Sequence, residues 1–191
     1  MTPETVISIC LGIGLSASVG FRVFLPLFAL SLASYFDVWQ LNESWEWVGS
    51  IPALITLGVA TLVEICAYFI PYIDNLLDSI AIPLAGLAGT AVMLSTVGDL
   101  SPVVTWSLAI IAGGGTAAAI AGTSSATRLT STANTAGLAN PVVSTIETGS
   151  SVVMSIISLV FPYLALILVV LLLIIVFRLF LRFRKKKSTV D

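Results

Sequence analysis

The chain has 191 residues, of which 58% are hydrophobic and only 9% are charged. A soluble domain carries roughly 25% charged residues, because its folded surface must face water. The composition therefore excludes an ordinary soluble fold and predicts a protein embedded in a lipid bilayer.

The basic residues are gathered at one end of the sequence. Six of the eight follow a long apolar run, namely Arg178, Arg182, Arg184, Lys185, Lys186 and Lys187. A nucleic-acid partner is excluded, because its recognition needs basic residues spread over a folded face. Basic residues directly after an apolar helix instead predict a cytoplasmic tail beside anionic lipid headgroups, over residues 184–191.

A helix crosses a bilayer with about 20 predominantly apolar residues. In chain order, such stretches are predicted at about 4–34, 50–71, 76–98, 103–122, 140–160 and from Pro162 to about 183. The first stretch is too long for one perpendicular crossing, and it contains three glycines and Pro26. Residues 35–50 are rich in tryptophan and acidic residues and lack basic ones. They predict an interfacial loop or short helix on the non-cytoplasmic side.

These elements predict an all-α fold, a polytopic transmembrane helix bundle of about six spans. Residues 1–183 form a single transmembrane domain in this prediction, and the basic tail follows it. An even number of spans places both termini on one side of the membrane, and the basic tail makes that side the cytoplasm. We expect a multi-pass protein of the cell inner membrane, surrounded by membrane lipids.

The two halves of the sequence are weakly similar to each other. Residues 16–22 resemble 122–128, and each segment leads from small residues to a lone arginine; residues 62–64 resemble 145–147, each ending in glutamate. Three spans per half would make residues 4–98 and 102–183 inverted repeats with broken helices, which is typical of transporters. Alternatively, both small-residue segments serve only the close packing of membrane helices.

Four charged residues lie within or beside apolar segments: Arg22, Glu64, Arg128 and Glu147. A charge at mid-membrane costs about 2.5 kcal/mol or more, so each must face protein or water and find a partner. In a functional interpretation, the arginines hold an anionic group, and a glutamate neutralises or releases them or carries a proton. In a structural one, two Arg–Glu pairs lock the bundle. The sequence leaves both open.

Residues 123–135 form a polar stretch that includes Ser124 and Thr127. Unpaired hydroxyls are costly in hydrocarbon, so this stretch should line a water-filled cavity or project into the cytoplasm. The glycines at 113–115 just before it allow a break in the helix. After it, Asn140 and Pro141 open a helix whose N-terminus suits an anion. Simple helix capping is the alternative that we favour for Asn140.

Asp74 and Asp78 lie one helical turn apart near the predicted membrane edge. They could share a cation, but stabilisation of a helix start is the favoured interpretation. An intramembrane aspartyl protease is disfavoured, because Thr96 replaces the first glycine of a Gly-x-Gly-Asp motif. The chain has no histidine, and no nucleophile–base pair or metal-binding cluster is visible. We therefore expect no enzyme, no catalytic residue, no cofactor and no metal.

Several segments resemble one known family. They are residues 20–26, 63–64, 70–74, 127–128 and 135–144, the last running Thr-Ala-Gly-Leu-Ala-Asn-Pro-Val-Val-Ser. The sequence is similar through these segments, up to about residue 165, to bacterial integral membrane proteins of domain-of-unknown-function family 4126. The resemblance implies a small multi-span membrane protein and carries no established activity.

The placement of the two arginines and two glutamates in apolar segments favours a small transporter or lipid-flippase-like protein, acting alone or as a homo-oligomer. Its substrate would be anionic or amphipathic, such as a lipid phosphate. The predicted substrate-binding residues are Arg22, Arg128, Glu64, Glu147 and Asn140. The predicted secondary residues are Asp74, Asp78, Ser124 and Thr127. The alternative is a non-transporting membrane scaffold or assembly factor.

Overall fold

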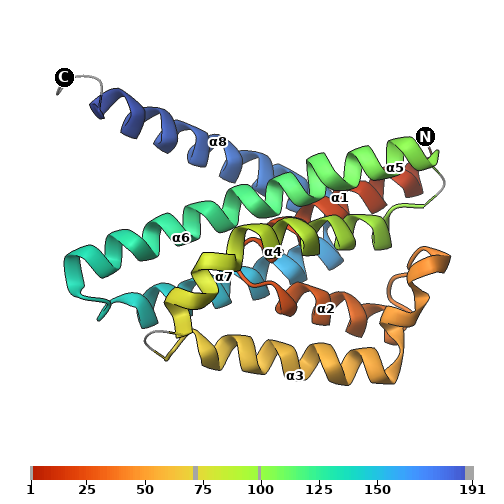
Figure 1. Ribbon diagram of the computed structural model, residues 1–191. Helices are drawn as coiled ribbons and strands as arrows, with labels where there is room; N and C mark the ends of the chain where they lie inside the picture. Colours follow the sequence, from red (N-terminus) through yellow and green to blue (C-terminus); the bar gives the residue numbers. More distant parts are fainter. Residues whose placement is uncertain (1, 71–72, 99, 188–191) are drawn as a thin grey trace.

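The computed structural model describes residues 2–70, 73–98 and 100–187, and its regular elements are helices (Figure 1). The predicted all-α fold is confirmed over this part of the chain. In order, the helices are α1 (Pro3–Val19), α2 (Phe24–Tyr35), η1 (Glu43–Gly49), α3 (Ile51–Ala67), α4 (Ile73–Thr96), α5 (Pro102–Leu108), η2 (Ala109–Gly114), α6 (Gly115–Thr135), α7 (Asn140–Val160) and α8 (Pro162–Lys187).

Helix α3 begins where the local sequence predicts it. The Ser50 side chain accepts a hydrogen bond from the Ala53 backbone N–H at 3.4 Å, and Pro52 lies in the first turn, where its missing N–H is not needed. The predicted loop or short helix before it is the 3₁₀ helix η1. Between the predicted stretches 50–71 and 76–98, residues 71 and 72 lie outside the described residues, and α4 starts at Ile73.

The first predicted stretch, too long for one perpendicular crossing, is not a single helix. It consists of α1 and α2, which fold back on each other at residues 20–23 and form a hairpin (Figure 1). Pro26 explains the break, because a proline in a continuous helix clashes with the carbonyl four residues earlier. That carbonyl belongs to Arg22. Here Pro26 lies instead in the first turn of α2, where proline is tolerated.

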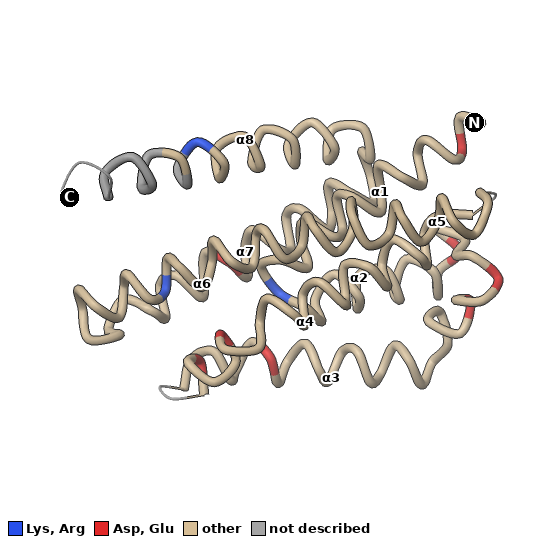
Figure 2. The backbone as a smooth tube through the Cα atoms, turned by 45° about the horizontal axis from the view of Figure 1, so that its top comes forward, with Lys and Arg blue, Asp and Glu red and all other residues tan. Residues whose placement is uncertain are grey.

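The two ends of the bundle are defined by different contacts. At the end that we call the amino end, the start of α1 (Glu4, Thr5 and Ser8) lines one pocket with residues 40–43, with Thr96 at the end of α4 and with Gly98. At the carboxyl end, Val176 and Phe177 of α8 line a groove with the turn after α6. The start of α1 and the last part of α8 therefore lie at opposite ends (Figures 1 and 2).

The prediction that both termini lie on the cytoplasmic side of the membrane stays a prediction, because helices alone do not define the two sides of a membrane. The α1–α2 hairpin starts and returns at the amino end of the bundle. Residues 4–98 also begin and end at the amino end, so the second predicted repeat starts in the same direction as the first. The helix directions consequently do not give the inverted relation that three spans per half would produce.

Residues 102–135 form one continuous helix through α5, the π-helical segment η2 and α6. Its 34 residues extend about 51 Å, well beyond a hydrocarbon core of about 30 Å. The glycines at 113–115 do not break it. The polar stretch is helical, and its hydroxyl groups find acceptors within the helix: Thr123, Thr127 and Thr130 each donate to the carbonyl four residues earlier, at 2.8–3.0 Å.

Three helices of the described part are long and apolar enough to cross a membrane: α4, the continuous helix over 102–135, and α7. The number is four if η1 and α3, which meet at 65°, form one broken span. The remaining apolar helices are shorter, including α1, α2 and the 162–178 part of α8. Helix α8 runs on to Lys187, so residues 184–187 extend it; positions 188–191 of the predicted tail lie outside the described residues.

Helix α7 is polar on its buried side and apolar on its exposed side. Its buried polar residues recur every three or four positions: Asn140, Ser144, Glu147, Ser151, Ser155 and Ser158. Its exposed residues include Val142, Ile146, Val153, Ile156 and Val160. A helix of a soluble protein shows the reverse pattern. Hydrocarbon around the bundle accounts for it, so the apolar helices indicate a membrane protein.

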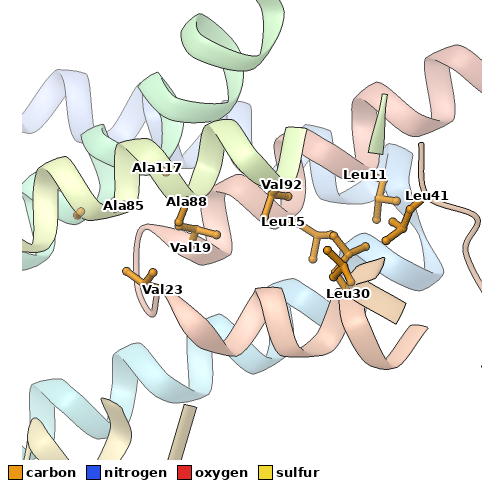
Figure 3. Packing of buried hydrophobic residues seen from close by; sticks show 12 residues of the cluster. Leu11, Leu15, Val19, Val23, Leu30, Leu41, Ala85, Ala88, Val92 and Ala117 are labelled. Carbon is orange, nitrogen blue, oxygen red and sulfur yellow. The ribbon is translucent and has the colours of Figure 1, made fainter. Parts of the chain in front are cut away.

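The core forms around α1, which contacts α4, α6, α7 and α8. Leu11, Leu15 and Val19 of α1 pack on Val92 and Ala88 of α4 (Figure 3). Helix α3 is peripheral, since it packs chiefly on α2 and η1. The centre of the bundle is therefore tightly filled, whereas the space between α3 and α4 is not.

Close backbone contact between α4 and η2 gives a test of this packing. A Cβ added to Gly89 would lie 2.8 Å from the carbonyl oxygen of Gly113 and 2.6 Å from the Ala117 Cβ. We expect Gly89→Val to lower the free energy of unfolding by about 1–3 kcal/mol. Chemical unfolding in detergent measures it.

The control is Gly149→Ala on the exposed side of α7, where an added Cβ has no described atom within 4 Å. It should leave stability unchanged or raise it by up to about 1 kcal/mol through helix propensity. Equal stability of both variants would contradict the α4–η2 packing.

Candidate functional site

Two buried arginines meet at one glutamate near the carboxyl end of the bundle. Arg22 lies in the α1–α2 turn and Arg128 in α6, and their exposed fractions are 1% and 2%. Arg22 Nη2 is 3.6 Å from Glu147 Oε2. Arg128 donates from Nη2 to the same oxygen and from Nε to Oε1 at 3.3 Å. The structural interpretation offered two Arg–Glu pairs; in the structure both arginines share Glu147 instead.

The other hydrogen bonds of Arg22 come from the polar side of α7. Its Nη2 donates to the Ser144 carbonyl at 2.9 Å and to Ser144 Oγ at 2.6 Å, and its Nε donates to Thr148 Oγ1 at 2.9 Å. Sequence reasoning missed both residues. The signal was the three-to-four spacing of polar residues from Asn140 onward, which places them on the same helix face as Glu147.

An aspartate and a tyrosine complete the site. Asp78 Oδ1 is 3.6 Å from Arg128 Nε, so its predicted role in helix capping is wrong and its partner is an arginine. The guanidinium carbons of Arg22 and Arg128 lie 4.0 Å and 4.2 Å from the ring centre of Tyr68. Such contacts stabilise a cation by its attraction to the ring's π face. We call Arg22, Arg128, Glu147, Asp78 and Tyr68 the arginine–glutamate cluster.

Glu64 binds backbone rather than an arginine. Its Oε1 accepts from the Val23 N–H at 2.7 Å, and its Oε2 accepts from the Phe24 N–H at 3.0 Å. Helix α2 has no capping side chain of its own at Val23. The Glu64 carboxylate therefore supplies acceptors and negative charge at the positive end of α2. It fixes the hairpin turn that carries Arg22.

Asn140 also has a different role from the predicted cap. Its Nδ2 donates to Asp74 Oδ2 at 3.0 Å and to Thr132 Oγ1 at 3.1 Å, and α7 has no side-chain cap among the described residues. Asp74 also lies in the first turn of α4. Asn140 thus connects the starts of α4 and α7 to α6, next to the arginine–glutamate cluster.

The remaining two predicted residues lie outside the cluster. Ser124 is half-buried one turn before Arg128, and Thr127 is exposed. Thr127 lines a groove of about 1,190 Å³ between α6 and α8, which we call the α6–α8 groove. One wall carries hydroxyl and amide groups of α6, and the other is formed by Leu173, Val176 and Phe177. The predicted polar stretch thus lines a groove.

A second space lies between α3 and α4, and we call it the α3–α4 cavity. Its volume is about 390 Å³, and most of its lining is apolar. Val23, Phe24, Glu64 and Tyr68 form the part of its wall that is shared with the hairpin turn and the arginine–glutamate cluster. The cavity therefore joins a hydrocarbon-like space to charged groups.

Each arginine keeps one nitrogen free. The Nη1 atoms of Arg22 and Arg128 are buried and have no hydrogen-bond acceptor in the described part of the chain, and Asn140 Oδ1 likewise has no donor. Each Nη1 carries two N–H donors. The cluster can therefore still donate to an additional acceptor. Figure 2 shows that acidic and basic positions lie together in this part of the bundle, whereas the charged positions at the amino end are acidic.

These features define the class: a helical membrane protein with a buried, shared-carboxylate arginine site. The chain belongs to the family described as "Domain of unknown function (DUF4126)", whose model matches residues 9–182. The match extends past residue 165, where the resemblance was expected to end, and it includes every residue of the cluster. No curated protein and no solved structure matches the chain.

Removal of the shared carboxylate tests the cluster. We expect Glu147→Ala to lower the free energy of unfolding in detergent by about 3–5 kcal/mol, because it leaves buried arginine charge uncompensated. The matched control is Glu46→Ala, which removes an exposed glutamate of η1 and should change stability by less than about 0.5 kcal/mol.

A double-mutant cycle completes this test. Glu147→Ala combined with Arg128→Ala should destabilise by less than the sum of the two single changes, because the pair is lost only once. Additive effects, or a Glu147→Ala variant as stable as Glu46→Ala, would contradict a shared Glu147.

Proposed function

We propose that the protein is a small transporter or lipid-flippase-like protein of the bacterial inner membrane that handles an anionic or amphipathic substrate. In this proposal an anionic group of the substrate binds Arg22 and Arg128. One observation carries it: both arginines are almost completely buried, and each has an Nη1 without an acceptor among the described residues.

Energetics support a binding role over a purely structural one. A buried donor without an acceptor costs about 1–3 kcal/mol, and more when it belongs to a charged group. A cluster that only locks helices together gains by satisfying every donor. An anion with several oxygens, such as a phosphate group, would accept from both Nη1 atoms in strong charge-assisted hydrogen bonds. The free donors are therefore explained if a substrate supplies the acceptors.

The charge balance supports proton coupling. The ionisable groups of the cluster and its neighbours are Arg22, Arg128, Glu147, Asp78, Glu64, Asp74 and Tyr68. Two guanidinium groups face four carboxylates, so an arriving anion adds negative charge to a site that is already rich in it. Burial disfavours uncompensated charge. Protonation of one carboxylate on binding lowers this excess by one charge and weakens that carboxylate's hold on an arginine, which can then bind the substrate.

The helix directions support a topology of five crossings and one hairpin. The crossings are α3, α4, the continuous helix over 102–135, α7 and α8, in place of the six predicted from the sequence. The positive-inside rule assigns the carboxyl end, with Arg178 and the basic residues after it, to the cytoplasm. The acidic amino end then faces the other side, and the α1–α2 hairpin extends Arg22 about 25 Å from there into the bundle.

A non-transporting scaffold is the second candidate, and one observation favours it. The cluster connects five parts of the fold: the α1–α2 turn, the end of α3, α4, α6 and α7. In a scaffold, variants of the arginines would lose stability without changing the affinity for any ligand. In a transporter, they would lose affinity as well. Neither candidate involves covalent chemistry.

Anion-dependent thermal stability separates the two candidates. We expect inorganic phosphate at millimolar concentration to raise the melting temperature of the detergent-solubilised protein, since a ligand that binds only the folded state stabilises it. The rise should be lost in Arg22→Gln and Arg128→Gln. It should persist in the control Arg178→Gln, which removes an exposed arginine of α8. An equal rise in all three variants would favour the scaffold.

Proton coupling predicts a definite sign for the effect of pH. If one proton is taken up with each anion, the affinity should rise as pH falls, by up to about tenfold per unit. Phosphate itself gains a proton near neutral pH, so sulfate serves as the probe, because its charge is constant over pH 5–8. Titration of melting temperature against sulfate at pH 5, 6, 7 and 8 measures the dependence. A sulfate affinity independent of pH would contradict coupling.

A further inference from the structure

We propose that the substrate is an anionic lipid whose headgroup is a phosphate monoester and whose hydrocarbon chain occupies the α3–α4 cavity. The headgroup would displace Glu64 from the N-terminus of α2 and bind the free Nη1 of Arg22. This inference rests on the proposed anion-handling function and names the class of its substrate. It follows from the contacts of Glu64, the composition of the cavity wall and the packing of α3.

The position of Glu64 marks an anion site that the protein fills with its own carboxylate. The two Glu64 oxygens accept from the Val23 and Phe24 N–H groups, at 2.7 Å and 3.0 Å. Backbone N–H groups at the start of a twelve-residue helix are suited to phosphate oxygens. Arg22 directly precedes these two residues, is 1% exposed, and has no acceptor for its Nη1 among the described residues. Its guanidinium group interacts electrostatically with the Glu64 carboxylate.

The cavity next to this turn suits a hydrocarbon chain. Its volume of about 390 Å³ is within the roughly 300–1,000 Å³ of typical ligand pockets. Apart from Glu64, Tyr68 and Thr56, its wall is apolar: Val23, Phe24, Val59, Ala60, Val63, Ala67, Leu77, Ile80, Ala81 and Leu84. An inorganic ion would gain nothing from this wall. A molecule with an apolar chain and an anionic head matches both parts.

The cavity is also placed for entry from the bilayer. Helix α3 packs chiefly on α2 and η1, so the space between α3 and α4 is not closed by side-chain packing. Val63 of α3 and Ile80 of α4 line the cavity, and their exposed fractions are 62% and 48%. Exposed apolar side chains at the rim of a cavity allow a lipid chain to enter sideways without crossing water.

The larger α6–α8 groove is a weaker candidate for the same chain. Its described lining contains hydroxyl, amide and apolar groups but no charged residue. The free arginine nitrogens and the α2 N-terminus have no counterpart there. We therefore assign the chain to the α3–α4 cavity, and the experiment compares the two spaces directly.

Photo-crosslinking in lipid nanodiscs tests the assignment. The probe is phosphatidic acid with a diazirine in one acyl chain, and the crosslinked residues are identified by mass spectrometry. Labelling of α3 and α4 around Ala60 and Leu84, reduced by excess unlabelled phosphatidic acid but not by phosphatidylcholine, is the expected result. Labelling confined to the α6–α8 groove, or competition by phosphatidylcholine alone, would overturn the proposal.

Two variants and a control make the test specific. Glu64→Gln removes the competing charge and should tighten phosphatidic acid binding by about tenfold. Ala60→Phe fills the cavity and should weaken it by about tenfold or more, while the thermal response to inorganic phosphate persists. Leu62→Phe, on the exposed side of α3 at 65% exposure, should leave both unchanged.

The outcomes distinguish failure of this inference from failure of the proposed function. If inorganic phosphate stabilises the wild-type protein but phosphatidic acid binding is unaffected by Ala60→Phe, the chain assignment is wrong and the anion site stands. If neither inorganic phosphate nor phosphatidic acid binds the wild-type protein, the anion site and the chain assignment are both wrong. If Ala60→Phe melts at a lower temperature than the wild type, its weaker binding can result from lost stability. The crosslinking map of the wild-type protein then decides by itself which space holds the lipid chain.

Discussion

The fold is organised by the cost of keeping two guanidinium groups inside a membrane protein. Neither Arg22 nor Arg128 reaches water, so each needs carboxylates, hydroxyls and an aromatic face from other helices. Glu147 serves both, and this explains why α7 turns a polar side inward. The same requirement fixes the position of the α1–α2 turn, because Arg22 reaches Ser144 and Thr148 only if the chain reverses there.

Local sequence signals predicted much of the fold and little of the pairing. Three helix starts were predicted to within a few residues from local chemistry, by a capping serine or by a proline in the first turn. These signals are Ser50 with Pro52 for α3, Pro102 for α5 and Pro162 for α8. The position of the break at residues 20–23 was not predicted, because hydropathy is continuous across it, although the length of the stretch and Pro26 carried a signal. As a result, a hairpin of α1 and α2 stands where one span was predicted. The spacing of its serines predicts which side of α7 is polar, and this is the side that the structure buries.

The charged residues were found from sequence, whereas their partners were not. A lone charge in an apolar segment is conspicuous in a sequence, so Arg22, Glu64, Arg128 and Glu147 stand out. Which carboxylate meets which arginine depends on where the hairpin turn lies relative to α3 and α7. Glu64 pairs with backbone because the turn presents two free N–H groups to it. Tyr68 and Asp78 join the arginines only through the packing of α3 and α4 ends around α6.

The buried arginines are held with donors free for an anionic group. An experimental structure of the protein in nanodiscs containing phosphatidic acid tests this arrangement. We expect density for a phosphate group against Arg22 Nη1 and the start of α2, with Glu64 turned away. Unchanged bonds from Glu64 to Val23 and Phe24, with both Nη1 atoms bound to protein acceptors and no lipid beside them, would contradict it.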